Sequence, residues 1–130
     1  MRATQHPGLY LLKNDKKGRS VHSANLIRKG DLIEICPIIK LSKKDLKRIH
    51  RTVLFEYYFL WGRKLEKGAI ALGYGSLYNH ADKPNARFQL DLINDEIHIL
   101  CKRKISPGQE ITISYTDESR SDVKLWFKPL

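Results

Sequence analysis

Two segments hold the residues of this chain that could do chemistry, and we call them the polar segments because each ends in polar side chains. The first is Gly73–His80, an apolar and aromatic run that ends in the pair Asn79-His80 ahead of a proline-containing turn. The second is Ile105–Tyr115, which ends in a tyrosine. Amide, imidazole and phenol groups all make hydrogen bonds, so these side chains could hold a ligand. Taken alone, however, Asn79-His80 is most simply a hydrogen-bonded turn that ends a strand, and Tyr115 a half-buried core residue.

Other common chemistries lack their sequence patterns. There is no glycine-rich phosphate or dinucleotide loop, no Gly-x-Ser-x-Gly elbow and no His-Glu-x-x-His pair. His98 and Cys101 form one His-x-x-Cys, but nothing completes a zinc ligand set, so we expect no metal site. Cys36 and Cys101 are expected to be buried thiols. The carboxylates of a predicted turn, which we expect to face solvent, are Asp91, Asp95 and Glu96.

The elements that must position these residues are short strands. Apolar and β-branched runs predict strands at Gly8–Leu12, Ser20–Ala24 and Leu32–Cys36. Pro37 is expected to stop the third strand, although Ile38-Ile39 stays extended. Further strands are expected as a hairpin, at Arg87–Asp91 and Glu96–Cys101, and at Glu110–Tyr115, where apolar and polar residues alternate.

Turns and helices complete the pattern. Ser42 is expected to cap one clear helix, with Asp45 in its first turn. Thr52–Trp61 is aromatic and β-branched, which favours a strand over a second helix. Ser106-Pro107-Gly108 has the residues of a type II turn. Val123–Phe127 is a short apolar tail segment. The sum predicts a mainly β domain with one or two short helices.

Length and charge bound the class of protein. The chain has 130 residues, 24 Lys+Arg against 14 Asp+Glu and a net charge of +10, which fits one domain with a basic surface. The basic residues gather in Arg2–Lys29 and Lys40–Arg51. Such a surface favours contact with nucleic acid or an acidic partner, or is simply a solvated face. The longest apolar stretch, Val53–Trp61, is too short to span a membrane, and an intracellular protein is expected.

The two polar segments together resemble the signature of SET-domain lysine methyltransferases. Asn79–Asn85 is similar to the family's Asn-His-x-x-x-Pro-Asn, and Gly108–Tyr115 to its Gly-x-Glu-(Leu/Ile)-x-x-x-Tyr, in the same order. Gly18–Val21 and Lys29-Gly30 are similar to its N-terminal element. The resemblance covers about Tyr10–Tyr115 and is strongest to the minimal, virus-encoded members.

The resemblance implies a SET-domain fold of the β-clip type with a C-terminal pseudoknot, where Asn79-His80 and Tyr115 meet. Residues 1–130 would be a single SET domain without cysteine-rich flanking modules. The tail, 116–130, would close the channel or make a dimer contact. The family property that follows is S-adenosylmethionine-dependent methyl transfer to a lysine of a histone or another basic protein.

The resemblance also implies roles for individual residues. Tyr115 would be the catalytic tyrosine. The residues that would bind the cofactor are Gly18, Arg19, Ser20, Tyr58, Asn79, His80 and Trp126. The residues that would line the lysine channel are Tyr74, Tyr78 and Ile113. For the aromatic residues of both groups, ordinary packing is the alternative, and for Trp126 a dimer contact as well. Because Ile113 is aliphatic and forms no hydrogen bond, more than monomethylation is expected.

Two departures from the family pattern favour an alternative. Ser20 replaces the second glycine of Gly-x-Gly, and Ala81-Asp82 replaces the usual Ser-Cys. The alternative is a non-catalytic SET-like module that binds nucleic acid or an acidic partner through its basic face. For an enzyme, the +10 charge is a difficulty because it repels a basic substrate at long range. Either the acidic patch lies beside the substrate groove, or the basic face docks the accompanying nucleic acid. Homodimerisation and a cytoplasmic or nuclear location are further expectations.

Overall fold

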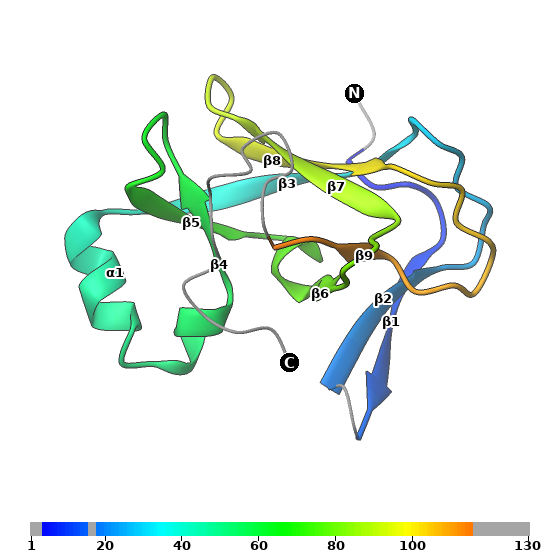
Figure 1. Cartoon of the computed structure of the whole chain (residues 1–130), viewed down its shortest axis with the longest axis horizontal. Helices are drawn as coiled ribbons and strands as arrows, with labels where there is room; N and C mark the ends of the chain where they lie inside the picture. The colour runs from blue at the N-terminus through cyan, green and yellow to red at the C-terminus, as the bar shows by residue number, and fades with distance from the viewer. Residues whose placement is uncertain (1–3, 16–17, 116–130) are drawn as a thin grey trace.

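The computed structural model describes residues 4–15 and 18–115, which form three small sheets around one core (Figure 1). The strands are β1 (Leu9–Asn14), β2 (Gly18–Ser23), β3 (Leu32–Leu41), β4 (Tyr58–Trp61), β5 (Lys67–Ala71), β6 (Asn79–His80), β7 (Ala86–Asp91), β8 (Glu96–Cys101) and β9 (Thr112–Ile113). The helical elements are α1 (Lys43–Ile49) and the 3₁₀ turns η1 (Val53–Glu56) and η2 (Gly75–Leu77). The predicted mainly β class is confirmed.

The central sheet has the strand order β4-β5-β3-β8-β7, with antiparallel neighbours throughout. β3 holds it together, because its first part pairs with β8 and its last four residues pair with β5. Pro37 lies where the partner changes, opposite Glu96, and its carbonyl accepts from Leu72 N at 2.8 Å. The prediction that Pro37 ends the strand is wrong: a missing N–H is tolerated where one ladder stops and the next begins.

Local sequence signals place the turns and the helix. Gly108 has φ +83°, and Gln109 N donates to Ser106 O at 3.0 Å, the geometry of the predicted type II turn. At α1, Asp45 N donates to Ser42 Oγ at 3.1 Å and Ser42 N to Asp45 Oδ2 at 2.9 Å, a reciprocal capping box. The predicted hairpin is confirmed as β7 and β8.

The aromatic segment 52–61 is only half a strand. Thr52 caps η1, where Leu54 N donates to Thr52 Oγ1 at 3.2 Å, and the chain becomes extended only at β4. The strand prediction is therefore right for the second half alone. The backbone of Thr52 is extended, but its side-chain cap starts a 3₁₀ turn in place of a strand ladder, which composition does not reveal.

A short parallel pair, β6 with β9, joins the two polar segments (Figure 1). Asn79 lies opposite Thr112 and His80 opposite Ile113, and Ala81 N donates to Ile113 O at 3.0 Å. Of the strand predicted at 110–115, the structure forms β9, Thr112–Ile113. The predicted alternation is confirmed because Ile113 is fully buried. The pairing brings together the segments that the expected pseudoknot joins.

The core lies between the sheets and is built of apolar side chains from every layer. Its fully buried members include Val21, Ile27, Ile33, Ile97, Ile99, Ile105 and Ile111. Cys36 and Cys101 are buried thiols, as predicted. Within residues 4–15 and 18–115, no helix has the length and apolar character needed to cross a membrane.

Candidate active site

Asn79 is the point where three distant segments meet. Its Nδ2 donates to Arg19 O in β2 and to Glu110 Oε2, both at 2.7 Å. One amide therefore ties the predicted cofactor loop to β6 and to the segment that leads into Tyr115. His22 also pairs with Glu110 across an isolated bridge, which joins the same segments through the backbone.

His80 and Tyr115 lie in direct contact. The backbone N–H of Tyr115 donates to His80 Nδ1 at 3.1 Å, and the two rings lie 5.1 Å apart. Because Nδ1 accepts, the proton of a neutral imidazole lies on Nε2, which is 3.3 Å from Asp82 Oδ1. The residue that replaces the family's cysteine thus contacts the imidazole.

The hydroxyl of Tyr115 points at backbone. It donates to Tyr78 O at 3.2 Å. Burial raises the pKa of this phenol, and the neighbouring charges of Tyr57 and Glu56 add to the effect, whereas a hydrogen bond with the backbone of His80 opposes it. The hydroxyl therefore stays protonated at neutral pH. Sequence reasoning missed Tyr57 and Glu56, which lie at the end of η1 and act electrostatically on Tyr115.

Asn85 fastens β9 in place, and sequence reasoning missed it as a site residue. Its Nδ2 donates to Glu110 O at 2.8 Å, and its Oδ1 accepts from Thr112 N at 2.9 Å. The side chain is 9% exposed. The signal was present, because Asn85 ends the Pro-Asn motif that carried the resemblance.

The predicted cofactor loop, Gly18–Ser20, is exposed at Gly18 and buried at Ser20. Gly18 has φ +74°, and among the described residues beyond its chain neighbours no atom lies within 4 Å of where a Cβ would lie; Arg19 is exposed. Ser20 is buried, and its Oγ lies 2.7 Å from His22 Nε2. Among the described non-glycine residues only Leu65 and Asp95 have positive φ, so serine at position 20 needs no glycine conformation.

Tyr58 lies in the core beside α1. Its hydroxyl lies 2.6 Å from His50 Nε2, and the rings stack at 5.7 Å. Burial raises the pKa of Tyr58 to about 12. These contacts give the residue a packing role, and its cofactor role stays a prediction.

The predicted channel residues divide between core and loop. Tyr78 is 1% exposed and its hydroxyl donates to Glu34 Oε1 at 2.7 Å, while its carbonyl accepts from the Tyr115 hydroxyl. Tyr74 is half-buried and Ile113 is fully buried. Their channel roles stay predictions. Trp126 and the tail 116–130 lie outside the described residues.

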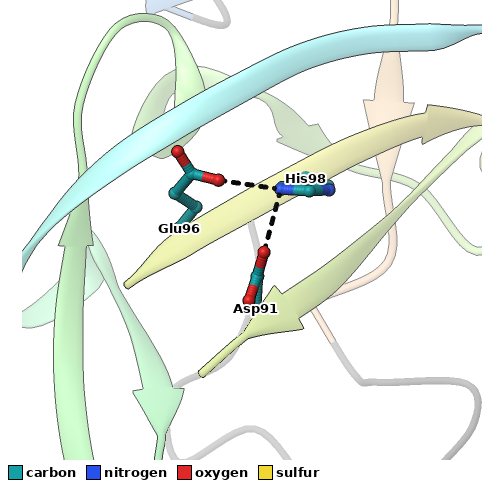
Figure 2. Close-up of side chains that lie close together, drawn as sticks. All are labelled: Asp91, Glu96 and His98. Carbon is teal, nitrogen blue, oxygen red and sulfur yellow. Dashed lines mark hydrogen bonds and ion pairs between the residues drawn. The ribbon is translucent and has the colours of Figure 1, made fainter. Parts of the chain in front are cut away.

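The acidic patch, Asp91, Asp95 and Glu96, has side-chain partners in the described structure. His98 Nε2 lies 3.2 Å from Glu96 Oε1 and 3.6 Å from Asp91 Oδ2, so one imidazole sits between two carboxylates (Figure 2). Asp95 pairs with Lys40 at 3.1 Å. The three side chains in Figure 2 could offer ligand atoms within 4.8 Å of one another. Sequence reasoning grouped Asp91 with Glu96 and predicted the hairpin that pairs them, but it missed that His98, two residues along β8 from Glu96, joins them.

Family comparison agrees with the meeting of these segments. Residues 18–116 match the SET domain family, and the chain belongs to it. A curated relative, the histone-lysine N-methyltransferase specific for H3 lysine 37 of Schizosaccharomyces pombe, is 34% identical over 121 residues, covering 92% of this chain and 77% of the relative.

Solved structures give the same fold. A Plasmodium falciparum protein described as a candidate histone methyltransferase has TM-score 0.71 and 30% identity, covering 95% of this chain and 99% of that chain. The Neurospora histone lysine methyltransferase DIM-5 has TM-score 0.68 and 14% identity, covering 98% and 57%. The likeness to the minimal viral members stays a prediction.

Proposed function

We propose that this chain is an S-adenosylmethionine-dependent protein-lysine N-methyltransferase with Tyr115 as its catalytic tyrosine. The observation that carries the proposal is the contact of the two signature segments, in which the Tyr115 N–H bonds His80 Nδ1 and the Tyr115 hydroxyl bonds Tyr78 O. Family membership supports the same activity.

The proposed catalysis is alignment. Methyl transfer from a sulfonium to an amine is an in-line displacement that needs a neutral amine and fixed approach, and fixed approach can supply several kcal/mol. The Tyr78 carbonyl and the Tyr115 hydroxyl offer oxygen atoms that can hold an amine and the methyl hydrogens. Because burial raises the pKa of Tyr115, its hydroxyl stays protonated to a higher pH than that of a free tyrosine.

The residues around Asn79 suit the cofactor. Gly18 leaves an open edge, and the exposed guanidinium of Arg19 can pair with a carboxylate. Asn79 is already held by Arg19 O and Glu110, so its amide is oriented in advance. The cofactor would supply the electrophilic methyl group, and these residues, with the backbone of His80, would orient it.

Histone H3 is the first substrate to test, since the curated relative acts at lysine 37 of that protein. Other histones and basic ribosomal proteins are the comparison set. The expected result is transfer of labelled methyl to H3 that is lost when that lysine is replaced by arginine. Tyr115→Phe should lower the rate about a hundredfold, as removal of an aligned donor does. Absence of transfer to every basic protein, or undiminished transfer by Tyr115→Phe, would overturn the proposal.

Product analysis tests the methyl number. Ile113 is apolar and fully buried, so it can offer no hydrogen bond to hold a water molecule or amine in place of a second methyl group. We expect mass spectrometry to find di- or trimethylated lysine at long incubation. A purely monomethyl product would contradict this expectation.

A second candidate function, nucleic-acid binding, follows from the charge around α1. Its exposed basic residues are Lys43, Lys44, Lys47 and Arg48, and of these Lys43 pairs with Glu66 at 2.9 Å. Such a face can dock nucleic acid, either beside the substrate or as the sole function of a non-catalytic module. Calorimetry with S-adenosylmethionine separates these cases, because no binding favours the module.

The docking face can be tested by charge reversal. Lys44→Glu with Lys47→Glu should weaken binding to duplex DNA and its salt dependence. The matched control, Lys83→Glu with Lys104→Glu, makes the same charge change at other exposed sites and should have a smaller effect. Equal effects would assign the binding to net charge alone. Sedimentation of the full chain would test the predicted homodimer.

A further inference from the structure

Glu34 is a carboxylate buried in the core behind the site. It lies in β3 and is 1% exposed. Oε1 accepts from the Tyr78 hydroxyl at 2.7 Å, and Oε2 accepts from Tyr74 N at 3.0 Å and from Gln5 Nε2 at 2.9 Å. A buried carboxylate is costly unless it is hydrogen-bonded, so three donors indicate a built arrangement.

The loop before β6 is shaped to admit this carboxylate. Gly73 has φ +67°, and a Cβ there would collide with Glu34 Oε2. The next residue, Tyr74, gives its N–H to the same oxygen. Glu34 thus bonds the loop near its start at Tyr74 and near its end at Tyr78.

The far side of Tyr78 is the candidate active site. Its hydroxyl donates to Glu34, and its carbonyl accepts from the Tyr115 hydroxyl at 3.2 Å. A single residue therefore joins the buried carboxylate to the predicted catalytic tyrosine. Movement of the Tyr78 side chain would displace the oxygen that orients Tyr115.

We propose that Glu34 is a positioning residue for methyl transfer, acting through Tyr78 on the hydroxyl of Tyr115. The proposal rests on the function proposed above. Its expected signature is a fall in kcat with little change in the KM for S-adenosylmethionine, because the side-chain bonds that hold Asn79, to Arg19 O and Glu110 Oε2, do not involve the Tyr78 side chain.

The first test is Tyr78→Phe, which keeps the buried ring and removes only the hydroxyl. We expect kcat, normalised to cofactor-binding sites, to fall about tenfold, the scale of one lost hydrogen bond. The matched control is Ser23→Ala. Ser23 is also fully buried, and its hydroxyl bonds only the backbone of Asn25 in the described structure, so kcat should stay within about twofold.

A second pair of variants acts on the carboxylate itself. Glu34→Gln can still accept from Tyr74 N through its carbonyl and donate its amide to the Tyr78 hydroxyl, so kcat should stay within about threefold of wild type. Glu34→Ala removes all three bonds, to Tyr78, Tyr74 and Gln5, and should lower kcat at least as much as Tyr78→Phe. Retained kcat in a folded Glu34→Ala protein would overturn the proposal.

A spectroscopic readout separates this proposal from the proposed function. The ¹³Cζ resonance of Tyr115, assigned with Tyr115→Phe, reports its hydroxyl hydrogen bond whether or not methyl is transferred. We expect Tyr78→Phe to shift it and Ser23→Ala to leave it. If the wild-type protein transfers no methyl group but the Tyr78→Phe shift occurs, the proposed methyltransferase function is contradicted and the positioning of the Tyr115 hydroxyl through Tyr78 is supported. An unmoved resonance, or an equal kcat loss in Ser23→Ala, would overturn the positioning role.

Discussion

The backbone N–H of Tyr115 donates to Nδ1 of His80 across 3.1 Å, so an imidazole lone pair, in addition to the sheet ladder, fixes the end of the second signature segment against the first. The bond places the proton of a neutral His80 imidazole on Nε2. It also makes the His80 side chain an anchor for the backbone of the segment that ends at Tyr115. A histidine that serves in this way needs no direct part in chemistry to be essential.

Replacing His80 tests that anchor. His80→Ala leaves the Tyr115 N–H without its acceptor, which should lower the free energy of unfolding by about 1–3 kcal/mol and reduce the methyl-transfer rate. His80→Asn offers an amide oxygen near the position of Nδ1 and should retain more of both. Urea unfolding and initial rates measure the two variants. Equal losses in Ala and Asn would show that the acceptor atom is not what matters.

The pH dependence of methyl transfer should be set by lysine and not by Tyr115. The acceptor amine must lose its proton, and free lysine has a pKa near ~10.4. Burial raises the pKa of Tyr115, so its neutral hydroxyl persists above the pH where a free tyrosine ionises, near ~10. We expect the rate to rise from pH 7 to about pH 10 without a falling limb. A bell with its descending side below pH 9 would contradict the raised pKa.

Replacing Asn85 should lower the free energy of unfolding by more than is usual for a side chain of its size. Asn85→Ala would leave the Glu110 carbonyl and the Thr112 N–H unpaired in a site that is 9% exposed. The expected loss is about 2–4 kcal/mol in the free energy of unfolding. Asn25→Ala is the control, because its amide makes one exposed bond to Pro7 O. Its loss should stay within about 0.5 kcal/mol, and comparable losses in both would refute the special role of Asn85.

Local chemistry was predictable, and contacts between distant segments were not. The cap of α1 and the type II turn each depend on residues within four positions of one another, and both predictions were confirmed. The residues are Ser42 with Asp45 and Pro107 with Gly108. The two-residue pairing of β6 and β9 has no local signal, and only the family resemblance brought those segments together.

Buried polar residues escaped prediction for a related reason. Glu34 is the charged residue of the predicted strand Leu32–Cys36, and the sequence cannot show that Tyr78, 44 positions away, supplies one of its donors. Pro37 was misjudged because the change of strand partner that tolerates it depends on β5 and β8 together.

Asp45 gives the acid limb of the stability curve a testable origin. Its bonds to Ser42 lower the pKa of this exposed carboxyl, so the charged form is favoured in the folded state. The resulting stabilisation is complete above the unfolded-state pKa of about 3.9 and is lost as pH falls through the lower folded-state pKa. Asp45→Asn can keep the cap without a titrating group and should flatten the loss between pH 4 and 2 in urea midpoints, with Asp15→Asn, an exposed turn carboxylate, as control. An unchanged slope in Asp45→Asn would assign the acid limb to other carboxylates.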